Sequence, residues 1–281
     1  MTRFLQVDVF ASAPFTGNPL AVFPDAGHLT GEQMLQIARE MNLSESTFVT
    51  RRDPSSYEMR IFTPGTELPF AGHPTLGTAW VLGRLGYLTT ETVTQKTAAG
   101  VTTVSWSEDR VTFERQGSVQ PELDEAACAR IAEALGLDAC DIGLSAPWLS
   151  RPIGPAFAEA GLTHLHVPLA DADALGRAAL SGPIPGLSDE GAYCFTALEP
   201  GRMRARGFFP GFGITEDPAT GSAAAGLGIL LADRLGSAQV EVEQGIEMGR
   251  PSLIQLAATL GSVTVGGRVA PIFAGELENL P

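Results

Sequence analysis

Residues 69–77 read PFAGHPTLG, and a related stretch, PATGSAAAG, stands at residues 218–226. In both copies two glycines are separated by five positions, and a helical segment that follows ends in Arg-Leu-Gly. Self-similarity of this kind predicts two related halves. Chance similarity of turns rich in Gly and Pro is the alternative.

Each copy predicts a strand, a Pro/Gly loop and then a helix. The strand segments read RIFTPG at 60–65 and RGFFPG at 206–211, and Gly86 and Gly236 are placed to end the helices. Gly72 and Gly221 fall where each loop becomes a helix. A glycine there lets a ligand approach the backbone N–H groups closely.

Short strands dominate the rest of the chain. Thr30 with Gln33 predicts a capping box, Asp124 starts another amphipathic helix, and residues 171–180 are a third helical candidate. Further strands are expected at 20–23, 47–50, 58–62, 101–106, 111–114, 191–197, 240–243 and 262–265. This mixture favours an α+β fold in which largely antiparallel sheets wrap helices.

Composition and charge restrict the class of protein. The chain has 281 residues, 44% hydrophobic and 18% charged, with a formal charge of −14, which excludes disorder and makes nucleic acid and anionic membranes improbable partners. No signal peptide opens the sequence and no stretch has the ~20 apolar residues of a membrane span. Three scattered cysteines without metal-ligand spacing indicate reduced thiols in a cytoplasmic protein.

Two helix N-termini pointing into one cleft between the halves would bind a small carboxylate, because each presents N–H groups and a partial positive charge. The alternative is that the glycines only permit close packing. His73 follows Gly72 and could donate to a substrate or cap its helix, and Asp217 could bind substrate or form a turn.

Glu45 lies in the segment LSESTFV at 43–49, between an amphipathic helix and an apolar strand. A carboxylate in a partly buried site could act as a general acid/base, with burial disfavouring its ionised form and helix dipoles favouring it. A surface glutamate at the start of a strand is the alternative.

A resemblance to a known family rests on motifs in order along nearly the whole chain. The motifs are FTG at 15–17 followed by NPLAV at 18–22, SESTF at 44–48, RIFTP at 60–64, PFAGHPTLG at 69–77, EDPATGSA at 216–223, and QG at 244–245 with MGRPS at 248–252. Together they resemble the PhzF-like (phenazine-biosynthesis) family, which has the diaminopimelate-epimerase fold.

The resemblance implies two pseudo-symmetric domains, each a mostly antiparallel sheet rolled around a central helix. The N-terminal domain would comprise residues 1–117, completed by a last strand at about 268–281, and the C-terminal domain residues 118–267. It further implies a homodimer and an isomerase without a cofactor.

The resemblance also assigns roles to residues. Glu45 matches the acid/base that moves a proton within trans-2,3-dihydro-3-hydroxyanthranilate in the family's phenazine enzyme. His73, Asp217 and Ser222 match positions that contact the substrate. Gly72 and Gly221 match the glycines whose amides bind the substrate's carboxylate.

Racemases of the same fold use two cysteines, one at each helix start. Ala71 and Thr220 stand at those positions here, so a two-cysteine racemase is contradicted. One carboxylate, Glu45, fits removal and return of a proton on the same molecule.

Other classes of protein find less support. A small-carboxylate or protein-binding module without catalysis remains the main alternative. Ser222 lacks the Gly-x-Ser-x-Gly setting of a serine hydrolase and is better explained as a helix cap, and no phosphate-binding loop is complete. His164 and His166 alternate along a strand without a ligand partner, so packed or solvated histidines are expected there rather than a metal site.

Overall fold

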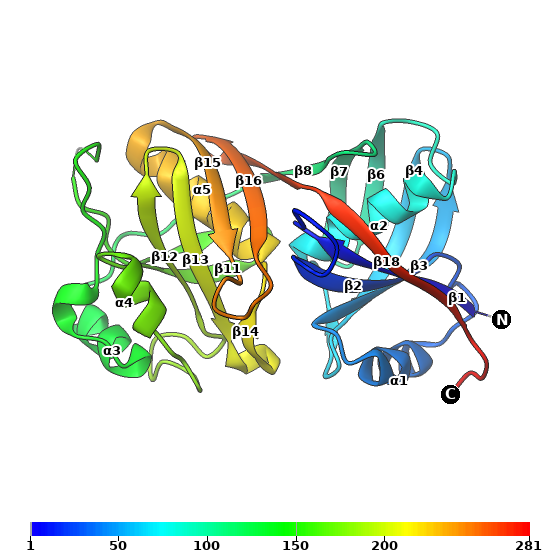
Figure 1. Cartoon of the computed structure of the whole chain (residues 1–281), viewed down its shortest axis with the longest axis horizontal. Helices are drawn as coiled ribbons and strands as arrows, with labels where there is room; N and C mark the ends of the chain where they lie inside the picture. The colour runs from blue at the N-terminus through cyan, green and yellow to red at the C-terminus, as the bar shows by residue number, and fades with distance from the viewer. Residues whose placement is uncertain (1, 150) are drawn as a thin grey trace. The chain divides into compact units, whose positions relative to one another are not determined.

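The computed structural model describes residues 2–149 and 151–281, and the chain divides into two compact units. Unit 1 comprises Met1–Glu114 and Gly266–Pro281, and unit 2 comprises Arg115–Val265. Both ends of the chain therefore belong to unit 1 (Figure 1). Strands β8 (Val111–Gln116) and β17 (Ser262–Gly267) carry the chain across the two boundaries.

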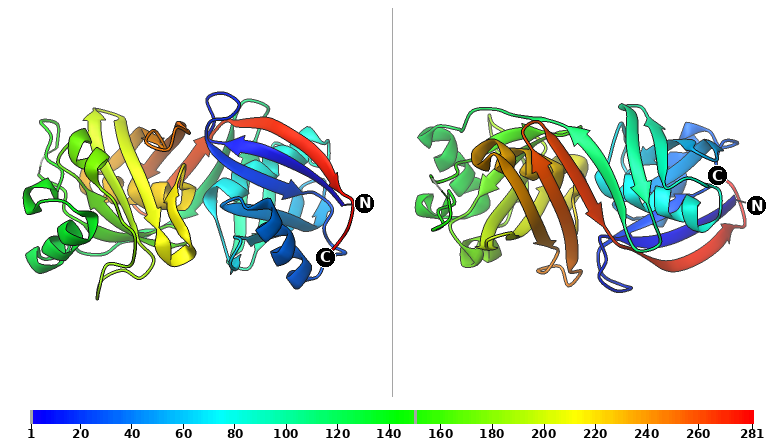
Figure 2. Two further views of the ribbon diagram at one scale, coloured as in Figure 1. Left: turned by 60° about the horizontal axis from the view of Figure 1, so that its bottom comes forward. Right: turned by 90° about the horizontal axis from the view of Figure 1, so that it is seen from above.

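Unit 1 is a curled sheet around one helix. Its chain order is β1 (Thr2–Val9), β2 (Asn18–Phe23), α1 (Gly31–Met41), β3 (Glu45–Asp53), β4 (Ser56–Phe62), β5 (Glu67–Leu68), α2 (Gly72–Arg84), β6 (Thr92–Thr97), β7 (Gly100–Trp106), β8 and, at the end of the chain, β18 (Val269–Leu277). Figure 2 shows β18 running beside β1, with which it pairs antiparallel.

Unit 2 repeats this plan. It contains β9 (Ser118–Val119), α3 (Glu125–Leu135), η1 (Ala139–Asp141), β10 (Ala156–Glu159), β11 (Thr163–Pro168), α4 (Ala172–Arg177), β12 (Ala192–Glu199), β13 (Arg202–Phe209), η2 (Pro210–Phe212), β14 (Ile214–Asp217), α5 (Gly221–Leu235), β15 (Ser237–Gln244), β16 (Ser252–Thr259) and β17.

The strand pairings of the two units have the same order. From β1 through β2, β3, β4 and β6 to β7 the pairs alternate antiparallel and parallel, beginning and ending antiparallel. The series β10, β11, β12, β13, β15 and β16 alternates in the same way. Shared topology on top of shared motifs makes duplication the explanation of the sequence repeat, and the predicted α+β fold is confirmed.

Helices α2 and α5 occupy the equivalent interior positions. Helix α2 contacts β1, β2, β3, β7 and β18, and α5 contacts β9, β10, β11, β15 and β16. Every residue from Gly72 to Gly83 and from Gly221 to Ala232 is buried. A helix that is apolar on all sides has to be covered on all sides, which is why a sheet curls around each one. Helices α1, α3 and α4 lie outside the sheets (Figure 1).

The second glycine of each motif is required by close packing. A Cβ on Gly77 would lie 2.6 Å from Leu20 Cδ2 on β2, and one on Gly226 would lie 2.6 Å from His166 Cε1 on β11. The packing interpretation of the glycines is therefore right for these two positions. The same contacts show that Leu20 in unit 1 and His166 in unit 2 occupy equivalent positions, each beneath the central helix of its own unit.

The outer helices are capped as the sequence predicts. Thr30 and Gln33 form the complete capping box of α1, and Asp124 caps α3. Helix α4 ends at Arg177, earlier than the expected 180. Arg206 Nη1 donates to the carbonyls of Leu175, Gly176 and Ala178, and these bonds take the place of a further helical turn.

Each unit also has an arginine–glutamate pair in front of its central helix. Arg60 on β4 binds Glu67 on β5 through two hydrogen bonds of 2.7 and 2.6 Å, and Arg206 on β13 binds Glu216 on β14 through two of 2.9 Å. The pair in unit 1 is partly exposed, whereas the Arg206 pair is largely buried. The two-point geometry fixes the short strand that leads into the helix.

We expect the two pairs to differ in their contribution to stability. Arg206→Met leaves Glu216 and three carbonyls without their donor in a buried place, so the free energy of unfolding should fall by ~3–5 kcal/mol. Arg60→Met, the matched control in the other unit, should cost at most about 1 kcal/mol because water reaches its pair. Urea unfolding of both variants measures the difference, and equal losses would contradict the assignment.

A second pair of variants tests the close approach at α5. Gly226→Ala forces a methyl group against the His166 ring, which should lower the free energy of unfolding by about 1–3 kcal/mol. Gly176→Ala on α4 meets nothing within 4 Å and should be neutral or stabilising. Thermal unfolding of the two proteins distinguishes them, and a stable Gly226→Ala protein would show that β11 can move away.

Candidate functional site

Glu45 is the first residue of β3, and its carboxylate is nearly enclosed. Strand β3 runs parallel to β2 with Glu45 opposite Leu20, so both strands begin at the same edge of the sheet. The residue is 7% exposed, and its Oε2 lies 3.5 Å from His73 Nε2. The structure thus brings the predicted acid/base next to one of the predicted substrate-binding side chains.

His73 is the second residue of α2 and is 2% exposed. Its Nδ1 lies 3.3 Å from the amide Nδ2 of Asn18, and Asn18 Oδ1 accepts a 3.0 Å hydrogen bond from Ser44 Oγ. Burial lowers the pKa of His73 to about 3, so the imidazole is neutral at neutral pH. The 3.5 Å approach to Glu45 is therefore a contact between a carboxylate and a neutral ring rather than an ion pair.

Helix α2 starts without a side-chain cap. Its N-cap is Ala71, an extended residue that cannot accept from the first turn, and Gly72 is the first helical residue. The N-cap of α5 is Thr220, which also makes no side-chain cap bond, and Gly221 follows it. Helices α1, α3 and α4 each have an N-cap side chain that accepts from the first turn. Among the α-helices of the described residues, only α2 and α5 have an N-cap residue without such a bond.

Asp217, at the end of β14, belongs to a buried network in unit 2. Thr220 Oγ1 donates to Asp217 Oδ2 at 2.7 Å. Gln244 accepts from the Thr220 amide and from the Tyr193 hydroxyl, and donates to the Asp217 carbonyl. The network holds the loop between β14 and α5 in one conformation, and it includes the glutamine of the QG motif.

Ser222 is the second residue of α5, the place that His73 takes in α2. Its Oγ lies 3.1 Å from His164 Nε2. The expectation that Ser222 caps the helix is wrong, because Thr220 is the N-cap and the hydroxyl turns to the histidine. Burial, with a contribution from His166, lowers the pKa of His164 to about 3, so this histidine is neutral too.

The candidate residues therefore form two clusters. Glu45, Gly72 and His73 lie together in unit 1, and Asp217, Gly221 and Ser222 lie together in unit 2. No role in the site was predicted from the sequence for the residues that hold them, Asn18, Ser44 and His164. A signal for Asn18 was present, because an amide at the start of the apolar strand NPLAVF is unusual for a packing position.

Metal binding finds no support in the described residues, since none of their His, Cys, Asp and Glu side chains gather in a group of three or more that could hold an ion. His166 is buried, with its two ring nitrogens against the carbonyls of His164 and Ala223, so the packed-histidine interpretation is confirmed. Nor is any helix in the described part of the chain both long and apolar enough to span a membrane.

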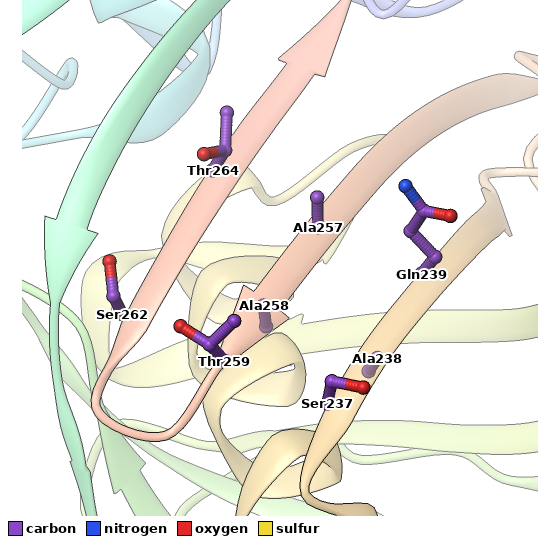
Figure 3. A pocket seen from close by; sticks show the side chains of 8 residues that line it. All are labelled: Ser237, Ala238, Gln239, Ala257, Ala258, Thr259, Ser262 and Thr264. Atoms are coloured by element: carbon purple, nitrogen blue, oxygen red, sulfur yellow. The ribbon is translucent and has the colours of Figure 1, made fainter.

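A separate hollow of about 400 Å³ lies on β15, β16 and β17 (Figure 3). Its lining consists of the small or neutral side chains Ser237, Ala238, Gln239, Ala257, Ala258, Thr259, Ser262 and Thr264. These side chains carry no charge and include none of the candidate site residues. The hollow has no group that could transfer a proton or bind a carboxylate strongly.

Comparison with known proteins gives a consistent result. The family model described as phenazine biosynthesis-like protein matches residues 7–275. The trans-2,3-dihydro-3-hydroxyanthranilate isomerase of Pseudomonas fluorescens is 41% identical, over 90% of this chain and 89% of that protein. An uncharacterised isomerase of Pasteurella multocida is 36% identical, over 96% of this chain and 92% of its own length.

Among solved structures, a predicted epimerase from Pseudomonas aeruginosa is 32% identical, covers 99% of this chain and 100% of its own, and superimposes with a TM-score of 0.84. The fold inferred from the sequence, the resemblance and the class of enzyme, an isomerase, are thereby confirmed.

The lowered pKa of His73 predicts how stability depends on pH. Between pH about 3 and 6.5 an unfolded histidine binds a proton that buried His73 does not, so the free energy of unfolding should rise with pH through this window, by up to ~1.4 kcal/mol per pH unit. His73→Gln removes this contribution, and the variant should lose less stability than wild type on acidification. Urea unfolding from pH 4 to 7 measures both slopes.

His164→Gln is the matched variant, since the pKa of His164 is lowered to the same value, and it should flatten the slope similarly. Parallel slopes for wild type and both variants would show that these histidines take up protons in the folded protein.

Proposed function

Because the chain belongs to the phenazine biosynthesis-like family, whose curated relatives include isomerases, we propose that it isomerises a small carboxylate-bearing substrate by moving a proton with Glu45. The observation that carries this proposal is the buried Glu45 carboxylate, 3.5 Å from His73 Nε2 in the unit whose central helix starts without a side-chain cap. A carboxylate next to a hydrogen-bond donor and a helix dipole is equipped for proton transfer.

The proposed reaction needs no other reactant. The Glu45 carboxylate takes a proton from a substrate carbon, and the electron pair left behind shifts along an adjacent double bond. The glutamic acid then returns the proton at the far end of the shifted bond. Atoms and charge balance, and the enzyme ends in its starting state. The step moves one proton and one electron pair within a single molecule, so no redox cofactor enters the proposal.

The remaining candidate residues would bind the substrate. The proposal assigns carboxylate binding to the amides of Gly72 and Gly221, because each follows an N-cap residue that makes no side-chain cap bond and a free N–H at a helix start can donate to a carboxylate. Asp217 and Ser222 are held by Thr220 and His164, so they offer fixed polar groups for a hydroxyl or amine. A homodimer, as the family resemblance implies, in the cytoplasm, as the three scattered cysteines indicate, completes the proposal.

The substrate named for the Pseudomonas fluorescens relative is the first compound to test. Wild-type protein incubated in D₂O with trans-2,3-dihydro-3-hydroxyanthranilate and related cyclic amino and hydroxy acids, without added cofactor, should incorporate deuterium or form an isomer detectable by NMR. Glu45→Gln keeps the shape of the side chain but cannot take up the proton, so the rate should fall by at least about 10²-fold.

Glu40→Gln, at an exposed position of α1, makes the same chemical change away from the cluster and should leave the rate unchanged. Exchange that continues in Glu45→Gln would remove this residue from the mechanism. If a compound raises the unfolding temperature of the wild-type protein but the protein does not exchange the compound's protons for deuterium, the result would support a binding module in place of an isomerase.

A further inference from the structure

Two polar residues, Ser44 and Asn18, form a hydrogen-bonded chain that ends at the ring of His73. Ser44 Oγ donates to Asn18 Oδ1 at 3.0 Å, and Asn18 Nδ2 lies 3.3 Å from His73 Nδ1. Asn18, the first residue of β2, is fully buried, as is nearly all of His73. With the oxygen of the amide turned to Ser44, its nitrogen is turned to the ring.

The chemistry of the amide decides the state of the ring. An amide nitrogen carries two N–H groups and accepts no hydrogen bond, so His73 Nδ1 has to be the acceptor. A neutral imidazole with a lone pair on Nδ1 carries its single proton on Nε2. An imidazolium would direct Nδ1–H against the amide N–H, so the same contact also opposes protonation of the ring.

The Nε2 atom points to Glu45. It is buried, makes no hydrogen bond to any residue that the structure describes, and lies 3.5 Å from Glu45 Oε2. A buried N–H without a hydrogen bond is costly, which indicates a place where a bound group is expected to accept.

The second unit has the equivalent arrangement. His166 and Leu20 lie beneath equivalent glycines, Gly226 and Gly77, and two residues before them on the same strand face are His164 and Asn18. His164 contacts Ser222 as Asn18 contacts His73, at the second residue of each central helix. A buried polar side chain at the start of the inner strand thus holds the corresponding helix residue in both units.

We propose that Asn18, oriented by Ser44, is a positioning residue that fixes His73 in the tautomer with the proton on Nε2, directed at Glu45 and at the substrate atom beside it. This inference rests on the proposed function for its role in catalysis. It makes His73 a hydrogen-bond donor that cannot accept a proton at Nε2, so that Glu45 keeps the proton it removes and returns it itself.

The tautomer can be measured without any substrate. In protein labelled with ¹⁵N-histidine, two-bond ¹H–¹⁵N correlation spectra at pH 7 distinguish protonated from unprotonated ring nitrogens, and loss of one of the four histidine patterns in His73→Gln assigns His73. We expect an unprotonated Nδ1 and a protonated Nε2, unchanged down to pH 5. A protonated Nδ1 in the wild-type protein overturns the proposal, because it would mean that the Asn18 amide presents its oxygen, not its nitrogen, to the ring.

Asn18→Asp tests the cause of this state. The new carboxylate has nearly the shape of the amide but can only accept, so His73 Nδ1 should become protonated, with the rate of isotope exchange falling about ten- to a hundredfold. Asn42→Asp, the same change at an exposed position, should leave the His73 pattern as in wild type. An unprotonated Nδ1 that persists in Asn18→Asp overturns the role of Asn18.

If Asn18→Asp does not fold, Asn18→Ala serves instead, and it should give averaged shifts from both tautomers. A pure Nε2–H pattern in that variant likewise overturns the role of Asn18. The spectra are independent of turnover. Isotope exchange that survives in Glu45→Gln would contradict the proposed function but not the tautomer of His73. If Glu45→Gln loses activity as expected but the wild-type ring carries its proton on Nδ1, only this inference is contradicted.

Discussion

The enclosure of one apolar helix by a curled sheet is the constraint on which the rest of each unit depends. From Gly72 to Gly83 and from Gly221 to Ala232 the two helices have no solvated face, so their side chains, apart from His73, are small or apolar, and a glycine stands where a strand comes closest. A helix in such a place has its polar groups satisfied along its length by its own hydrogen bonds, and only its ends require partners. At the starts of α2 and α5 the N-cap residues make no side-chain cap bond, so a ligand that accepts hydrogen bonds can contribute there.

The two units apply this constraint to different chemistry. In unit 1 the positions around the helix start hold a glutamate, a neutral imidazole and an amide, and in unit 2 they hold Ser222, its partner His164 and an aspartate. Strand and helix ends tolerate such replacements because their side chains do not have to fill the core between helix and sheet. A duplicated fold can therefore keep its packing while one copy has the glutamate that we propose as the acid/base and the other does not.

Burial changes what the histidines can do. His73 and His164 have pKa values far below that of a histidine in water, because a charged ring would lose its hydration. Neither ring is a cation at neutral pH, so His73 contributes no positive charge beside Glu45. A neutral ring with a fixed tautomer contributes direction to a hydrogen bond, which a freely titrating surface histidine would not.

The outer helices, many of the strands and the duplication could be predicted from the sequence alone, since apolar periodicity, the capping box at Thr30 and the paired glycines are local signals that act over a few residues. It also pointed to Glu45 and His73 through motifs of a recognisable family. Only the tertiary structure decided which residues hold them. Asn18 and His73 are 55 positions apart, and His164 and Ser222 58, so their contacts exist only because the sheet curls around the helix and brings strand starts to helix starts. Distances of that kind leave no periodic trace in a single sequence, and neither does the loss of hydration that keeps both rings neutral.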